Sequence, residues 1–369
     1  MERVKLNTGE ALVPALRALY ERSGYSRYKM SKFEEYDLYV RNKDFLVSDS
    51  VITFTDTNGR LMALKPDVTL SIVKNSKDTP GFAQKVYYQE NVYRISKGTA
   101  SFKEIEQVGL ECMGDLDAYC IFEVLSLACE SLRMISPDAV LDLSHLGIVS
   151  ALLDDLSQPP EVNEQLLKCL GEKNPHELRR ICAENGVVPE KTARLVALAE
   201  TYGPPAQVLQ ALDALDPPMP DRAPLDALRT LVGWFDGTPY AGMLRLDFSV
   251  VSAMKYYNGV VFKGFVPGVP ESILSGGQYD HLMKKLHRAS GAIGFAMYLD
   301  LLERFDRCDP YDVDTVLLYD ETADLNGLMA AVAGLQADGC AVSAQRTLPE
   351  KFRARRVLQY KDGEVIPVE

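Results

Sequence analysis

The sequence has no run of about eighteen consecutive apolar residues, which is the length that a membrane-spanning helix needs. Its first ten residues, MERVKLNTGE, contain neither the apolar stretch of a secretory signal nor an amphipathic leader rich in arginine and serine. These absences predict that the protein is cytoplasmic and has no membrane partner.

Metal ligands are scarce as well. The 369 residues include only four histidines, and none of the seven cysteines belongs to a Cys-x-x-Cys motif. Zinc sites are usually built from such pairs or from several histidines, and disulfide frameworks usually use an even number of cysteines. We therefore expect reduced and buried thiols, no metal and no cofactor.

Basic residues are outnumbered, because the chain has 40 Lys and Arg against 52 Asp and Glu, a formal net charge of -12. The phosphate backbone of nucleic acids repels an acidic chain, so this composition disfavours a nucleic-acid partner. What the sequence does have is 47% hydrophobic residues over 369 positions, enough for a substantial core in two or three domains.

The order of the predicted elements indicates an α+β fold. Apolar periodicity predicts a helix over 9–23 and another near 118–135. Between them, β-rich runs predict strands at 50–56, 60–65, 85–93 and 103–113. Because the strands do not alternate regularly with helices, we expect an antiparallel sheet of about six strands flanked by helices.

The chain is predicted to divide into three parts. Residues 146–239 have helical periodicity broken by prolines, and β-rich sequence resumes at 242–275. We therefore expect a core built from 1–145 and 240–305, with a helical insertion at 146–239. The pattern of 291–305, GAIGFAMYLDLLERF, predicts a buried core helix, and 310–369 predicts a small separate α/β unit.

Several polar residues could form a ligand site. Asp67 and Thr69 lie between a strand and a predicted helix start, where both residue types are also common as caps. Arg94 ends a tyrosine-rich strand, and Gln107 and Glu111 alternate onto one face of the next strand. Burying such groups without partners is costly, so either a ligand pairs with them or this face points to solvent.

Glycines and tyrosines accompany these polar residues. Gly109 lies between Gln107 and Glu111 and would leave room for a ligand. The segments KYYNGVVFKGFV (255–266) and ILSGGQYDHLMKKL (273–286) contribute Tyr256, Tyr257 and Tyr279. Tyrosines in strands usually serve packing, so these segments by themselves do not predict a site.

Together, in this order and at these spacings, the segments resemble the catalytic domain of class II aminoacyl-tRNA synthetases, specifically histidyl-tRNA synthetase. GYSRYKMSKFEEYDLY is similar to motif 1, VYYQENVYRISKG with KEIEQVGLE to motif 2, YYNGVVF and GGQYD to the two histidine-specific signatures, and GAIGFAMYLDLL to motif 3. The resemblance covers roughly residues 5–305. It implies a homodimer formed through the motif 1 region.

The resemblance also implies a histidine pocket. In that family the bound histidine is held by an acid and a threonine of one segment, by residues of motif 2 and by later tyrosines. The matching positions in this sequence are Asp67, Thr69, Arg94, Gln107, Glu111, Tyr257 and Tyr279, with Tyr256 beside them. The pocket is therefore expected to be kept, with an acid one carbon shorter at Asp67.

The ATP-binding half of the motifs does not match. Ser96 stands where motif 2 has a carboxylate, Ser252 and Leu301 stand where the family has arginines, Lys255 replaces an acid, and Tyr298 replaces a glycine. Adenylate formation needs cations around a triphosphate whose charge is redistributed in the transition state. We therefore expect no synthetase activity and no catalytic residues.

This combination resembles one branch of the family, the ATP phosphoribosyltransferase regulatory subunits of histidine biosynthesis. It implies a noncatalytic, histidine-responsive subunit that associates with a short catalytic phosphoribosyltransferase. Two alternatives stay open: a divergent histidyl-tRNA synthetase or other amino-acid-activating ligase, with replacement cations at Lys97, Lys103 or Lys255, and an RNA-binding synthetase-like protein. ATP-dependent pyrophosphate exchange separates the ligase from the regulatory subunit.

Overall fold

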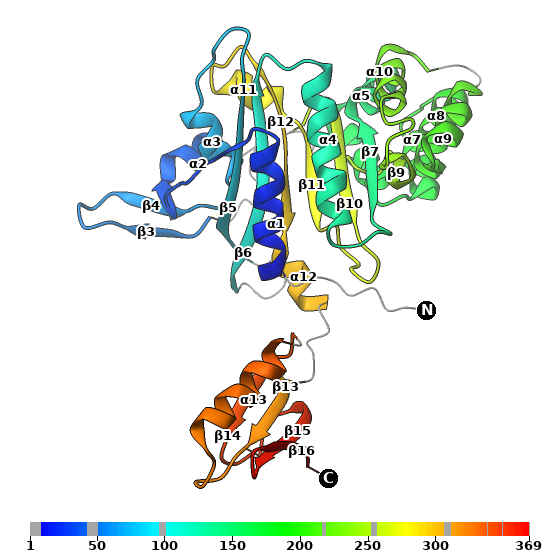
Figure 1. Ribbon diagram of the computed structural model, residues 1–369. Helices are drawn as coiled ribbons and strands as arrows, with labels where there is room; N and C mark the ends of the chain where they lie inside the picture. The colour runs from blue at the N-terminus through cyan, green and yellow to red at the C-terminus, as the bar shows by residue number, and fades with distance from the viewer. Residues whose placement is uncertain are drawn as a thin grey trace. The chain divides into compact units, whose positions relative to one another are not determined.

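The computed structural model describes residues 9–42, 51–95, 101–215, 219–251, 257–305, 311–337, 339–348 and 350–368. The chain forms two compact units, Met1–Asp306 and Arg307–Glu369. The first contains a nine-stranded sheet and a three-stranded sheet, and the second contains a four-stranded sheet (Figure 1). In the described ranges, no helix has both the length and the apolar composition that a membrane crossing requires.

The large sheet has the strand order β1-β5-β6-β12-β11-β10-β7-β9-β8. Its strands are β1 (Ser26–Arg27), β5 (Ala83–Ile95), β6 (Phe102–Gly114), β12 (Gly291–Tyr298), β11 (Leu274–Gln278), β10 (Val260–Phe265), β7 (Val140–His145), β9 (Leu244–Asp247) and β8 (Tyr202–Gly203). From β5 to β7 every neighbouring pair is antiparallel, which confirms the predicted α+β class. The edges of the sheet contain strands that the sequence did not predict as part of it. Of these, β1 pairs in parallel with β5, and β9 pairs in parallel with β7.

Two long helices, α1 (Gly9–Arg22) and α4 (Ala118–Arg133), cover one face of this sheet (Figure 1). Leu16 and Tyr20 of α1 and Leu132 of α4 are fully buried there, in one apolar core. Helix α4 begins where the side chain of Asp117 accepts a hydrogen bond from the Cys120 amide at 2.9 Å. Because these helices occupy one face, polar residues of the central strands are left to the opposite face.

Among the described residues, six helices lie between β7 and β9 in the chain: α5 (Leu146–Leu156), α6 (Pro160–Gly171), α7 (Pro175–Glu184), α8 (Pro189–Glu200), α9 (Pro205–Asp213) and α10 (Ala223–Gly233). Proline is the first residue of α6, α7, α8 and α9, where the missing N–H breaks no intrahelical bond. The helical character of 146–239 is therefore present, with the short β8 inside it and the 3₁₀ turn η2 (Ala241–Met243) after it. Its separation from the core as a domain stays a prediction.

A smaller sheet is formed by residues that lie between α1 and β5 in the chain. It consists of β2 (Phe33–Glu35), β4 (Leu61–Leu64) and β3 (Thr53–Thr55), and the helices α2 (Tyr36–Arg41) and α3 (Thr69–Asn75) follow β2 and β4 in the chain. The β3–β4 hairpin turns at Gly59, whose φ of +79° suits glycine. Strand β4 leads directly into the segment that carries Asp67 and Thr69.

The prediction of one helix over 291–305 is wrong. Residues Gly291–Tyr298 form β12, a central strand, and the helix α12 (Leu299–Phe305) begins only after it. Strand β12 buries Ala292, Ile293, Phe295 and Met297, so both of its faces are apolar. A strand buried on both faces lacks the alternation that distinguishes strands from helices in a sequence. The helix α11 (Asp280–Lys285) precedes β12 in the chain.

The second unit has the predicted order of strand, helix, strand and hairpin. Its elements are β13 (Val313–Leu318), α13 (Leu325–Ala337), β14 (Val342–Gln345), β15 (Ala354–Lys361) and β16 (Glu364–Pro367). Strand β13 pairs in parallel with β14 and β15, and the hairpin turns at Asp362 and Gly363, both with positive φ. Leu317, Leu328 and Tyr360 form a core of its own.

Candidate functional site

Predicted site residues from three elements meet at the carboxyl group of Glu111 on β6. The hydroxyl of Thr69, at the start of α3, donates to Oε1 at 2.6 Å. The hydroxyl of Tyr279, which precedes α11, donates to Oε2 at 2.6 Å. The exposed fractions of Thr69, Glu111 and Tyr279 are 8%, 2% and 1%. The fold thus assembles a buried polar group, the Glu111 cluster, from residues that are far apart in the sequence.

Asp67 has one of the two roles that the sequence left open, that of a helix cap, and its role as a ligand contact stays a prediction. Its Oδ1 accepts a hydrogen bond from the Leu70 amide at 2.9 Å, so it caps the first turn of α3. It is also buried at 8% exposure, and burial raises the pKa of its carboxyl, which the Leu70 amide and the charge of Arg94 partly offset. Arg94 is held at the same place, because its Nε donates to the Pro66 carbonyl at 3.1 Å.

The carboxyl group of Glu111 has unusual acid–base properties. Burial raises its pKa to about 8, although the hydrogen bonds from Thr69 and Tyr279 act in the opposite direction. The charge of Asp67 raises the pKa further. Near neutral pH this group can therefore hold a proton or accept hydrogen bonds, depending on what lies beside it.

The polar face of β6 is buried. Gln107 and Glu111 are both 2% exposed, so the alternative interpretation, in which this face points to solvent, is wrong for these two residues. The antiparallel register pairs Gln107 with Tyr298 of β12 and Glu111 with Gly294. Buried polar groups normally have partners, so this face is built to pair with something.

Tyr88 lies near the Glu111 cluster, although the sequence did not single it out. It lies opposite Gly109 in the β5–β6 register, and a Cβ on Gly109 would lie 2.5 Å from its hydroxyl oxygen. The room that Gly109 leaves is thus filled by Tyr88, which corrects the expectation that a ligand would fill it. Burial and the charges of Glu111 and Asp67 raise the pKa of Tyr88 well above its usual value. A glycine opposite a tyrosine is a recognisable signal, but only once the register is known.

Two further glycines accommodate the cluster. The ring of Tyr257 lies over Gly277, since a Cβ there would be 2.9 Å from Tyr257 Cδ1. The space beside Gly294 is occupied by the carboxylate of Glu111. Glycines therefore let the polar side chains lie flat against the sheet. Tyr256, which was also predicted, lies outside the described residues.

Tyr298 completes the group of tyrosines. Its hydroxyl lies 3.1 Å from the Ser275 hydroxyl. Burial raises the pKa of Tyr257 well above its usual value, and the neighbouring Tyr298, Glu111 and Asp67 raise it further. The sequence marked Tyr298 only as a replacement for glycine, not as a site residue.

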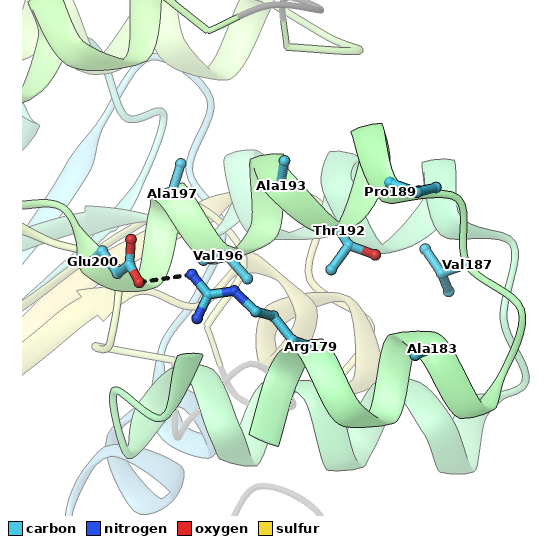
Figure 2. Close-up of a pocket in the computed structure, with 9 residues that line it drawn as sticks. All are labelled: Arg179, Ala183, Val187, Pro189, Thr192, Ala193, Val196, Ala197 and Glu200. Carbon is cyan, nitrogen blue, oxygen red and sulfur yellow. Dashed lines mark hydrogen bonds and ion pairs between the residues drawn. The ribbon is translucent and has the colours of Figure 1, made fainter. Parts of the chain in front are cut away.

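A separate hollow lies between α7 and α8, on the helical insertion (Figure 2). It has a volume of about 530 Å³, and the ion pair between Arg179 and Glu200, 3.0 Å long, lies at one end. Its lining is mostly small or apolar: Arg179, Ala183, Val187, Pro189, Thr192, Ala193, Val196, Ala197 and Glu200. It shares no residue with the Glu111 cluster and offers little for chemistry.

Comparison with known families agrees with the fold and with the motif positions. The family model for histidyl-tRNA synthetase matches residues 4–302. The chain belongs to the histidyl-tRNA synthetase family. All of the predicted site residues, from Asp67 to Tyr279, fall inside the matched range. Their role in binding histidine stays a prediction.

Within this family, the chain is similar to proteins named as regulatory subunits. It is 28% identical over 337 residues to the ATP phosphoribosyltransferase regulatory subunit of Desulforamulus reducens, covering 88% of this chain and 82% of that protein. This confirms the resemblance to that branch.

Two solved structures of the family share the fold. One, described as an ATP phosphoribosyltransferase regulatory subunit/histidyl-tRNA synthetase from Bacillus halodurans C, has a TM-score of 0.74 at 23% identity, over 95% of this chain and 93% of that one. The other belongs to an ATP phosphoribosyl transferase complex from Thermotoga maritima, with a TM-score of 0.62 at 17% identity, over 79% of this chain and 97% of that one. At these identities the likeness concerns the fold, which is that of a class II synthetase.

Proposed function

We propose that the chain is a noncatalytic regulatory subunit of ATP phosphoribosyltransferase, the first enzyme of histidine biosynthesis, and that the Glu111 cluster binds histidine. The observation that carries the proposal is that residues predicted to hold histidine lie together as one buried cluster. Three predicted histidine ligands, Thr69, Glu111 and Tyr279, are joined by hydrogen bonds of 2.6 Å. The name of the Desulforamulus relative, similar over 88% of this chain, supports the same role.

The chemistry of the cluster suits an amino acid with an imidazole side chain. Glu111 and Asp67 offer carboxyl oxygens to ammonium or ring N–H donors, and tyrosine hydroxyls can donate or accept. Arg94, anchored to the Pro66 carbonyl through Nε, has a planar guanidinium that suits a ligand carboxylate. These groups lie in a buried place, where each hydrogen bond to a ligand counts for more than in water.

The nucleotide side of the site gives no support for adenylate chemistry. Leu301, at the position of the motif 3 arginine, is 8% exposed and belongs to the main apolar core. A cation cannot be supplied from that position. Ser96, Ser252 and Lys255, three other departures from the family pattern, lie outside the described residues.

The proposal includes a partner and an assembly. A subunit without a reaction of its own would act on a short catalytic phosphoribosyltransferase, as the complex from Thermotoga maritima suggests. It would form a homodimer through residues of the motif 1 region and act in the cytoplasm. Histidine would regulate the complex only if it binds one conformational state better than another, because equal affinity for both states does not shift the equilibrium between them.

Calorimetry and pyrophosphate exchange test the proposal together. The purified chain should bind histidine and should show no histidine-dependent exchange of pyrophosphate into ATP. Mixing it with a short phosphoribosyltransferase should give a complex that co-elutes and is inhibited by histidine. No heat on titration with histidine would contradict the pocket assignment, and exchange above background would favour the ligase alternative.

A further inference from the structure

A second buried polar group lies on the same face of the large sheet as Glu111. The register runs from Glu111 to Gly294, Gly277, Val261 and then Ser144 of β7, and paired residues point to the same side. Asp142 is two residues before Ser144 and therefore shares this face. The neighbouring strand β9 continues the row with Asp247, one residue beyond the pair Leu143–Leu246.

These three side chains are all buried, but only one of them, within the described residues, has hydrogen-bond partners for all of its buried oxygen atoms. Asp142, Ser144 and Asp247 are 6%, 0% and 5% exposed. Asp247 accepts from Lys173 Nζ at 2.7 Å and from the Ser249 amide at 2.9 Å. By contrast, Asp142 Oδ1 and Ser144 Oγ have no hydrogen-bond partner within the described part of the chain. Residues two apart on a strand are separated by about 6.6 Å, so a single atom between their side chains could bind both.

No cationic side chain forms an ion pair with Asp142 in the described part of the chain. The positive charges of Lys173 and Arg245 lie near enough to lower the pKa of Asp142. Lys173 nevertheless pairs with Asp247, the guanidinium of Arg245 donates to backbone carbonyl groups, and Lys263, opposite Asp142 on β10, forms no ion pair with it there. Tyr202 offers Asp142 only a neutral hydroxyl. A buried carboxylate left in this state is costly unless a cation accompanies it.

We propose that Asp142 and Ser144 bind a monovalent metal cation of the potassium or sodium type. Their donors are hard oxygens, which alkali and alkaline-earth ions prefer. The single carboxylate of the pair matches a single positive charge, and the described residues contain no group of three His, Cys, Asp or Glu side chains that would suit a divalent or transition metal. A bridging water would satisfy the hydrogen bonds but not the charge. Lys173 and Tyr202 approach from the helical segment, so the ion would strengthen its attachment to the core sheet.

Ion-specific stability tests this site in the full chain. Denaturant unfolding is measured in KCl, NaCl and choline chloride at equal ionic strength, for the wild type, Asp142→Asn, Ser144→Ala and the control Asp138→Asn, an exposed acid just before β7. At a cation concentration one hundred times its Kd, the ratio of folded to unfolded protein should rise about 100-fold over choline. Both site variants should lose this gain, and the control should keep it. In choline, Asp142→Asn should be at least as stable as the wild type, because it removes a buried charge whose open oxygen no cation contacts.

Two results would overturn the proposal. Equal stability of the wild type in all three salts would mean that water, not an ion, lies between the two side chains. An ion-specific gain that survives in both Asp142→Asn and Ser144→Ala would place the cation elsewhere. If Asp142→Asn fails to fold in every salt, Ser144→Ala decides, since it removes one oxygen and leaves the charge unchanged.

Discussion

Glu111 and Asp142 are both buried acids on one face of the same sheet, yet the fold provides for them differently. Each oxygen of Glu111 receives a hydroxyl hydrogen bond of 2.6 Å, from Thr69 or Tyr279. Asp142 has one oxygen without a partner in the described residues. Burial is the main cause of a raised pKa in both, to about 8 for Glu111 and about 6 for Asp142. Hydrogen bonds satisfy the oxygens of a buried acid without removing its preference for the protonated form.

The largest effect that we expect from this difference is on the pH dependence of stability. An acid whose pKa is raised on folding contributes stability that is complete below its unfolded pKa and is lost as pH rises through its folded pKa. For Glu111 the loss should run from about pH 4.5 to about pH 8, and for Asp142 from about pH 3.8 to about pH 6. Between pH 6 and 8, Glu111→Gln should therefore flatten the curve of unfolding free energy against pH, whereas Asp142→Asn should not.

Denaturant unfolding at a series of pH values checks this, with choline as the only cation so that no alkali ion binds near Asp142. Subtracting the variant curve from the wild-type curve removes the other titrating groups, including His145, whose pKa burial lowers. A wild-type curve that is level between pH 6 and 8 and equal to that of Glu111→Gln would show that Glu111 ionises normally.

Ligand binding should show the next largest effect. Glu111→Gln or Gln107→Ala should weaken histidine binding roughly 5- to 150-fold, because a ligand donor left unpaired in a closed site costs about 1–3 kcal/mol. Calorimetry measures the change, and Glu104→Gln, an exposed acid on the same strand, is the matched control. In the complex with the phosphoribosyltransferase, inhibition by histidine should fall in proportion to the lost affinity. Unchanged inhibition in a variant that no longer binds histidine would move the regulatory site to another surface.

The comparison also shows what the sequence could predict. Thr69, Glu111 and Tyr279 were predicted as one group from the family resemblance, and the structure brings them together. Tyr88 was not, because its place opposite Gly109 depends on the register of β5 and β6, which no local pattern reveals. The Asp142 group was missed for the same reason, since strand β9 joins β7 from about one hundred residues away in the sequence.

The prediction of secondary structure failed where burial of both faces of a strand removed the alternation of apolar and polar residues. The middle of the sheet has six antiparallel strands, which is the predicted number, but the strands predicted at 50–56 and 60–65 lie in the smaller sheet and β7 was not predicted as a strand. Strand β12 is apolar on both faces and was predicted as a helix. Its glycines were the signal against a helix, because Gly291 and Gly294 disfavour a helix interior and suit close strand packing.

Removing one hydroxyl from the Glu111 cluster should have a smaller effect than changing Glu111. Thr69→Val keeps the shape of the side chain and removes a donor, so the free energy of unfolding should fall by about 0.5–1.5 kcal/mol near pH 7. The loss should increase above pH 8, where Glu111 is charged and its hydrogen bonds are stronger. Tyr93→Phe, which removes a hydroxyl bonded to the exposed Glu104, is the control and should change stability by less than about 0.5 kcal/mol.

The smallest effect on stability should come from changing an acid that is exposed to solvent. Glu200 pairs with Arg179 between α7 and α8 (Figure 2) at 3.0 Å. The two side chains are 51% and 55% exposed. Such a pair gains little, because water screens the charges and two long side chains lose freedom. Glu200→Gln should therefore lower the free energy of unfolding by about 1 kcal/mol or less, with no change in pH dependence between pH 6 and 8. Urea unfolding at low and high salt checks this, since the small loss should shrink further as salt rises. A loss well above that of Thr69→Val would contradict the contrast between buried and exposed acids, and would mean that the Arg179–Glu200 pair holds α7 and α8 together.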